Sequence, residues 1–190
     1  VSKDSLVYVA SNDIERNILV FKMSTDSVIS TEYRMVTGAD SIYAIDIDQN
    51  GRVYVTKPGT NGTDGKILVF KGISEDANWA GTHNSTPLYE IVVPNGLDLR
   101  GVTVNKEGTL IYVSDYTNKF VKCFTGSPST GYTLYNGFSY TFTDQPMASN
   151  GIDTIFPGPI GLTYMNEKNL VMLSCAQMFR LGVAYEYSKV

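Results

Sequence analysis

A repeated pattern of short strands is the feature that most constrains what this chain of 190 residues can fold into. Each copy contains a strand, a tight turn, a second strand, a loop and a third strand, all rich in Val, Ile, Leu and Tyr. If the second strands are aligned on Tyr8, Tyr54, Tyr112 and Val171, the copies recur after 46, 58 and 59 residues. Such a period is typical of folds that use one small β-unit several times.

The turns between the first and second strands support the same alignment. The clearest copy runs from Arg100 to Asp115 and a second from Tyr43 to Thr56, and each carries a glycine in its turn, at Gly108 and Gly51 respectively. Glycine suits a hairpin turn because it adopts positive φ without steric cost. A third copy, from residue 160 to 174, lacks this glycine.

Further strands are expected around this framework. The third strands are predicted at 17–22, 66–71, 119–124 and 182–187, and the fourth at 31–36, 88–93 and 139–142. The segment 79–86, which contains the single histidine His83, is expected to be a polar insertion, and no convincing amphipathic helix is present in the sequence.

These units predict an all-β fold, a β-propeller built of four-stranded antiparallel blades. One such meander cannot bury both its faces, and packing several around an axis solves this problem. Residues 1–190 are expected to form a single propeller segment of about three to four blades, with approximate bounds 1–38 (partial), 39–95, 96–150 and 151–190 (partial). We expect a six- or seven-bladed ring, whose remaining blades lie elsewhere in the protein or on a second chain. A β-sandwich is the alternative.

The framework from Gly101 to Asp115, with its Tyr112-Val113 pair, resembles the blades of the NHL-repeat, YncE-like and SMP-30 (gluconolactonase-like) propellers. The resemblance implies that ligands meet the face formed by the loops that enter the first strands and by those between second and third strands. The residues expected on this face are Arg100, Tyr43, Asp13 and Tyr116. The expected function is a non-catalytic, secreted (extracellular or periplasmic) module that binds a protein, a glycan or a small ligand.

The same resemblance supplies an enzymatic alternative. SMP-30-like hydrolases hold a divalent cation such as Ca²⁺ through carboxylate and Asn oxygens, and the metal activates water against a lactone or ester. Asp115 matches the Asp position of that family, whereas Arg100, Tyr43 and Ile160 stand near the place of its Asn and do not suit calcium. A metal-dependent lactonase or esterase would therefore need ligands outside this chain, and the other interpretation of Asp115 is a turn cap.

A second possible calcium site is the segment Asp46 to Gly51. Asp46, Asp48 and Asn50 match the first half of an EF-hand-like loop, in which alternating oxygens converge on the ion. Position twelve of that loop should be Glu but is Lys57, and the same residues are needed as a hairpin. The turn is the preferred interpretation.

Charge and composition exclude other classes of function. The net charge is −4, from 15 Lys and Arg against 19 Asp and Glu, without a basic stripe that would bind nucleic acid. No apolar stretch reaches the roughly 20 residues of a membrane span. With one histidine, the chain cannot assemble a multi-histidine zinc cluster. Cys123 and Cys175 are expected to be buried thiols, with a disulfide as the alternative. Some of the aromatic residues of segment 132–142 are expected to pack between blades, with sugar stacking as the alternative.

Overall fold

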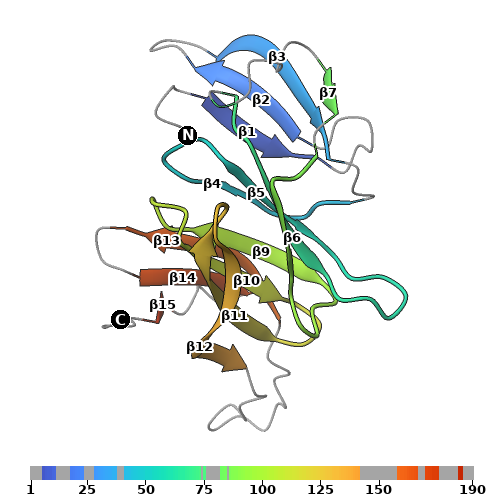
Figure 1. Cartoon of the computed structure of the whole chain (residues 1–190), viewed down its shortest axis with the longest axis vertical. Coiled ribbons are helices and arrows are strands. Elements are labelled where there is room, and N and C mark those ends of the chain that lie inside the picture. Colours follow the sequence, from blue (N-terminus) through green and yellow to red (C-terminus); the bar gives the residue numbers. More distant parts are fainter. Residues whose placement is uncertain are drawn as a thin grey trace, which may run out of the picture.

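The structure, a computed structural model, describes residues 6–11, 18–23, 28–37, 41–73, 75, 82–84, 86–141, 158–166, 170–175 and 184–185. The regular structure in these ranges is β-strand, organised as four sheets that, with the exception of β7, follow one another along the chain (Figure 1). Within this part of the chain, no helix is long and apolar enough to cross a membrane.

Neighbouring strands are hydrogen-bonded within each sheet in the following order. The first sheet contains β1 (Leu6–Ala10), β2 (Ile18–Met23), β3 (Val28–Val36) and β7 (Thr82–Asn84). The second contains β4 (Ile45–Ile47), β5 (Val53–Lys57), β6 (Lys66–Phe70) and β8 (Tyr89–Val92). The third contains β12 (Gly131–Thr141), β11 (Phe120–Ser127), β10 (Leu110–Asp115) and β9 (Leu99–Val104). The fourth contains β13 (Pro159–Met165), β14 (Leu170–Cys175) and β15 (Ala184–Tyr185).

The predicted equivalence of the repeats is confirmed by strand register. Tyr54 lies opposite Asp46 on β4 and Val69 on β6, and Tyr112 lies opposite Thr103 on β9 and Cys123 on β11. Both tyrosines therefore occupy the same place in antiparallel meanders. The all-β, blade-like prediction is correct, and the first strand of the second, third and fourth sheets lies at a sheet edge.

Three details differ from the prediction. Residues 82–84, expected within a polar insertion, form β7 and pair in parallel with β3. β12 begins at Gly131 instead of residue 139, because β11 continues to Ser127 and a tight turn returns the chain directly. In the fourth sheet, Met172 lies opposite Thr163, so Met172 and not Val171 holds the place of Tyr112.

Three apolar clusters join successive sheets. The first sheet packs on the second through residues that include Ile18, Val20 and Phe70, and the second packs on the third around Tyr54 and Ile111. The third packs on the fourth through residues that include Tyr112, Cys123 and Leu162. Alternate residues of β5 and β10 thus face opposite clusters, which explains why these strands are buried on both faces. Each large apolar side chain buried in these clusters contributes about 1.5–3 kcal/mol relative to an exposed one.

The aromatic segment follows this plan. Tyr132 is buried between the second and third sheets, where its ring meets that of Tyr89 edge-on at 5.7 Å. Tyr135 and Phe138 pack in the cluster between the third and fourth sheets. The predicted packing between blades is confirmed for these three residues, while the side chains of Tyr140 and Phe142 lie outside the described residues.

Candidate functional site

A cleft of about 670 Å³ runs along the first strands of the second, third and fourth sheets. Its walls are formed by residues 45–50, 102–104 and 162–164, together with Lys106 and Asn166. These strands β4, β9 and β13 contact one another in sequence, β4 on β9 and β9 on β13. The lining side chains with polar groups are Asp46, Asp48, Gln49, Asn50, Thr103, Lys106, Thr163, Tyr164 and Asn166.

A chain of hydrogen bonds crosses the three strands. The Thr103 hydroxyl donates to Asp46 Oδ2 at 2.7 Å, and the same carboxylate oxygen accepts the Val104 N–H at 2.9 Å. One sheet further on, Thr103 Oγ1 accepts the Tyr164 N–H at 2.9 Å. Asp46, Thr103 and Thr163 hold equivalent places in their sheets, so the same bond from side-chain oxygen to next-strand amide is made twice.

The Asp46 carboxylate is unusually placed for a charged group. Burial raises its pKa, while hydrogen bonds from Thr103, Val104 and Ile47 oppose the rise. The Ile47 N–H donates to Oδ1 at 2.8 Å, so both oxygens are engaged. Asp46 therefore links the second sheet to the third. Because burial raises its pKa, the charge of this carboxyl depends on pH at less acidic values than usual.

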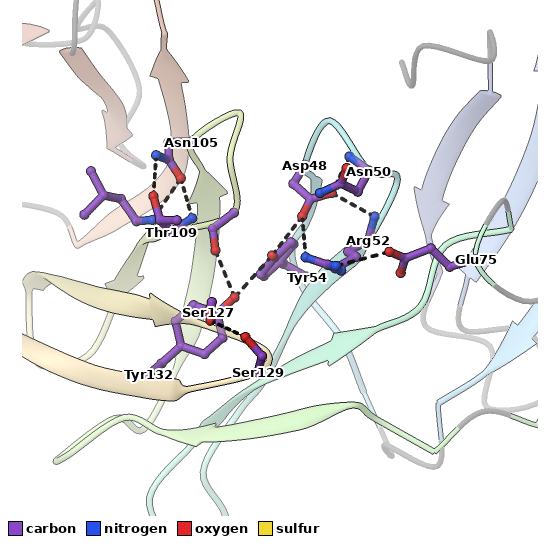
Figure 2. A network of polar contacts seen from close by, with 12 residues as sticks. Asp48, Asn50, Arg52, Tyr54, Glu75, Asn105, Thr109, Ser127, Ser129 and Tyr132 are labelled. Carbon is purple, nitrogen blue, oxygen red and sulfur yellow. Dashed lines mark hydrogen bonds and ion pairs between the residues drawn. The ribbon is translucent and has the colours of Figure 1, made fainter.

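The hairpin turns at one end of the cleft are closed by matching caps (Figure 2). Asp48 Oδ1 accepts the N–H groups of Asn50 and Arg52 at 2.8 and 3.0 Å. In the next sheet, Asn105 Oδ1 accepts the N–H groups of Thr109 and Leu110, both at 2.8 Å. These are the side-chain caps that favour Asp and Asn in turns.

The two turns are also joined to each other. The Tyr54 hydroxyl donates to Asp48 Oδ2 at 3.2 Å and lies 3.4 Å from the Tyr132 hydroxyl, which donates to the Gly108 carbonyl at 2.9 Å (Figure 2). Burial raises the pKa of both tyrosines. Asp48, 3% exposed, is thus surrounded by donors from its own turn and strand, which matches the predicted hairpin role.

Asp115, the predicted metal ligand of the SMP-30-like alternative, is the last residue of β10 and is fully buried. Its Oδ2 accepts the N–H groups of Leu97 and Asp98 at 2.6 and 2.9 Å, and its Oδ1 accepts the Asn118 N–H at 2.5 Å. Asp115 therefore stabilises two loops, the one before β9 and the one between β10 and β11. Within the described residues, no three His, Cys, Asp or Glu side chains gather where they could hold a metal ion.

Three of the residues predicted for the ligand face lie together. The Arg100 guanidinium carbon is 5.6 Å from the centre of the Tyr43 ring and 4.5 Å from that of Tyr116. Arg100 Nε donates to both oxygens of Asp98, at 3.1 and 2.9 Å. The fourth predicted residue, Asp13, lies outside the described residues.

Comparison with solved structures gives two similarities that carry information on the fold. A protein from Lactobacillus plantarum matches over 90% of this chain and 45% of its own, with a TM-score of 0.59 and 13% identity. A Bacteroides uniformis protein provisionally assigned as a 6-phosphogluconolactonase matches over 96% of this chain and 52% of its own, with a TM-score of 0.51 and 10% identity.

This chain has a β-propeller-type fold. It spans about half the length of the solved structures it matches. No protein-family model matches the sequence, and no curated protein matches it. At 10–13% identity, the similarities support the fold and leave the superfamily and the function to be argued from the site.

Sequence reasoning did not single out Thr103 and Thr163, which link or line the cleft. A signal was present, because these two and Asp46 are polar residues between apolar neighbours at the same position of each repeat. Their partners lie on a different repeat, 57 residues away between Asp46 and Thr103. The alternation of residues along one strand shows that such a position is polar. It does not show which residue of another repeat the side chain contacts.

Proposed function

We propose that this chain is part of a non-catalytic β-propeller that binds a small polyhydroxylated ligand in the cleft between β4, β9 and β13. The observation that carries the proposal is a difference among the polar groups of the cleft. The carboxylates of the cleft are occupied by bonds that hold the sheets and turns together, whereas several lining residues with amide, hydroxyl and amine groups are exposed. A wall of this kind suits hydroxyl groups, which both donate and accept hydrogen bonds.

The carboxylates are poorly suited to act as bases or metal ligands. Asp46 accepts three hydrogen bonds, from the Ile47 and Val104 amides and from the Thr103 hydroxyl. Recruiting it for chemistry would leave these donors unpaired, which costs about 1–3 kcal/mol for each buried group.

The side chains of Gln49, Lys106 and Thr163 are exposed. Within the described residues, they have no hydrogen-bonding partner. We propose that they make the ligand contacts, because all three line the cleft.

The experiment is a titration of the isotope-labelled protein with D-glucose, with the backbone amides of the cleft as reporters. Saturable shifts at 45–50 and 162–164, weakened at least about tenfold by Thr163→Ala, would support the proposal. Thr133→Ala, which removes an exposed hydroxyl from β12, is the matched control. Equal affinity in Thr163→Ala and the control would contradict it.

A metal-dependent lactonase is the second candidate, and the name of the Bacteroides uniformis protein favours its lactonase part alone. In this proposal, Asp115 exchanges its bonds to the backbone amides of residues 97, 98 and 118 for a Ca²⁺ site completed by residues outside this chain. The test is hydrolysis of gluconolactone by the purified protein with and without added Ca²⁺. Calcium-dependent turnover that Asp115→Asn abolishes, in a variant that still folds, would favour this candidate over the binding module.

A further inference from the structure

We infer that Arg100, Tyr43 and Tyr116 form a second binding site, which recognises a carboxylate or phosphate group of a small ligand. This site is distinct from the cleft. Tyr43 precedes β4 and Arg100 is the second residue of β9, whereas the cleft begins at Ile45 and Val102 and extends to the turns at the other ends of these strands. The inference therefore does not depend on the proposed function.

The guanidinium is held in a fixed plane. The two tyrosine rings lie 4.5 and 5.6 Å from its carbon, close enough for cation–π attraction. Asp98 fixes the Nε edge through both carboxylate oxygens, and its own position is fixed in turn, since the Asp98 and Leu97 amides bind the buried Asp115. Arginine usually loses side-chain entropy on binding, and an arginine already held in place loses less.

The opposite edge of the guanidinium is available. Within the described residues, the two Nη groups of Arg100 have no hydrogen-bonding partner, and the side chain is 42% exposed. Two parallel N–H groups match the spacing of two oxygens of a carboxylate or phosphate, which is why arginine binds such groups in a bidentate manner.

The aromatic neighbours add a second element of recognition. Tyr43 is 45% exposed, so part of its ring is open to a ligand. A ligand whose anionic group meets the Nη edge would place its carbon skeleton against this ring. Asp98 already balances the charge of Arg100, so attraction at long range is weak and binding depends on the geometry of the fork.

The experiment is an NMR titration of the labelled full chain with inorganic phosphate and, separately, with acetate, each against sodium chloride at the same ionic strength. Saturable shifts of the amides of Leu99, Arg100 and Tyr116 are expected for at least one anion. A response to phosphate alone assigns a phosphate ligand, and an equal or stronger response to acetate assigns a carboxylate. Absence of saturable shifts for both anions up to about 50 mM would overturn the inference.

Variants of Arg100 distinguish binding by the two parallel N–H groups of the guanidinium, the fork, from attraction to its positive charge alone. Arg100→Gln is expected to weaken binding at least about tenfold, and Arg100→Lys is expected to weaken it several-fold because the charge stays and the fork is lost. Lys71→Gln removes an exposed cation that follows β6 and should leave the affinity unchanged. Thermal unfolding of each variant checks that the fold persists. If Arg100→Gln or Tyr43→Leu folds and binds as tightly as Lys71→Gln, the site is refuted.

Discussion

Replacing Thr103 by valine should weaken the contact between three sheets at once. Valine keeps the shape of a side chain that is 2% exposed and removes its hydroxyl. The Asp46 carboxylate then loses a donor at 2.7 Å, and the Tyr164 N–H loses its acceptor at 2.9 Å. A hydrogen bond to a charged group contributes about 1.5–3 kcal/mol and a neutral one about 1 kcal/mol, so we expect a loss of about 2–4 kcal/mol in the free energy of unfolding.

The measurement is urea unfolding at neutral pH, followed by far-ultraviolet circular dichroism. Thr133→Val is the matched control, because Thr133 is an exposed strand residue with the same change in chemistry, and its effect should stay within about 0.5 kcal/mol. If both variants lose the same free energy, the bonds from Thr103 do not hold the sheets together and this account of the inner strands is wrong.

Three further predictions test other parts of the structure. Burial raises the pKa of Asp46 above 3.8, so the native state binds a proton more tightly than the unfolded chain; stability contributed by this group is present at low pH and is lost as pH rises through the native pKa. In urea unfolding from pH 4 to 7, Asp46→Asn should therefore remove this decline, and an unchanged pH dependence would contradict the assignment. Gly108→Ala should cost more stability in urea unfolding than Gly62→Ala, although both glycines have positive φ (73° and 79°). An added Cβ at Gly108 would lie 2.6 Å from Asp48 Oδ2, whereas no atom lies within 4 Å of an added Cβ at Gly62. Equal losses of stability would disprove the contact at Gly108. Cys123 is a free thiol whose pKa is raised by burial to about 11, so at pH 8 iodoacetamide should label it slowly in the folded protein and rapidly in urea, as mass spectrometry of the Cys123 peptide can show; rapid labelling without urea would contradict its burial.

Much of the fold could be predicted because its turns and strands are encoded locally. Gly51 and Gly108 have φ of 77° and 73°, as the hairpin pattern requires. Asp48 and Asn105, three residues earlier in each turn, supply the caps. β7 could not be predicted in the same way, because it pairs with a strand nearly fifty residues earlier and lacks a hairpin signal.

The site was harder to predict than the fold. The resemblance to propeller blades predicted Arg100, Tyr43 and Tyr116 on one face, and the structure brings their side chains together. The oxygens of Asp46 and Asp115 suggested metal binding, but the donors around them come from loops and strands distant in sequence. Residue type alone does not distinguish a carboxylate that binds a cation from one that binds backbone amides.

Hydrogen exchange at the amides of Val104 and Tyr164 tests most directly whether the first strands of the sheets, β4, β9 and β13, meet along the cleft. Both amides are bonded to side chains of the preceding sheet, Asp46 and Thr103 respectively, across a sheet edge. We predict exchange at least about 100-fold slower than for an unprotected amide, in a protein whose strands are otherwise intact. Exchange at the rate of an open edge strand would show that β4, β9 and β13 do not meet as described.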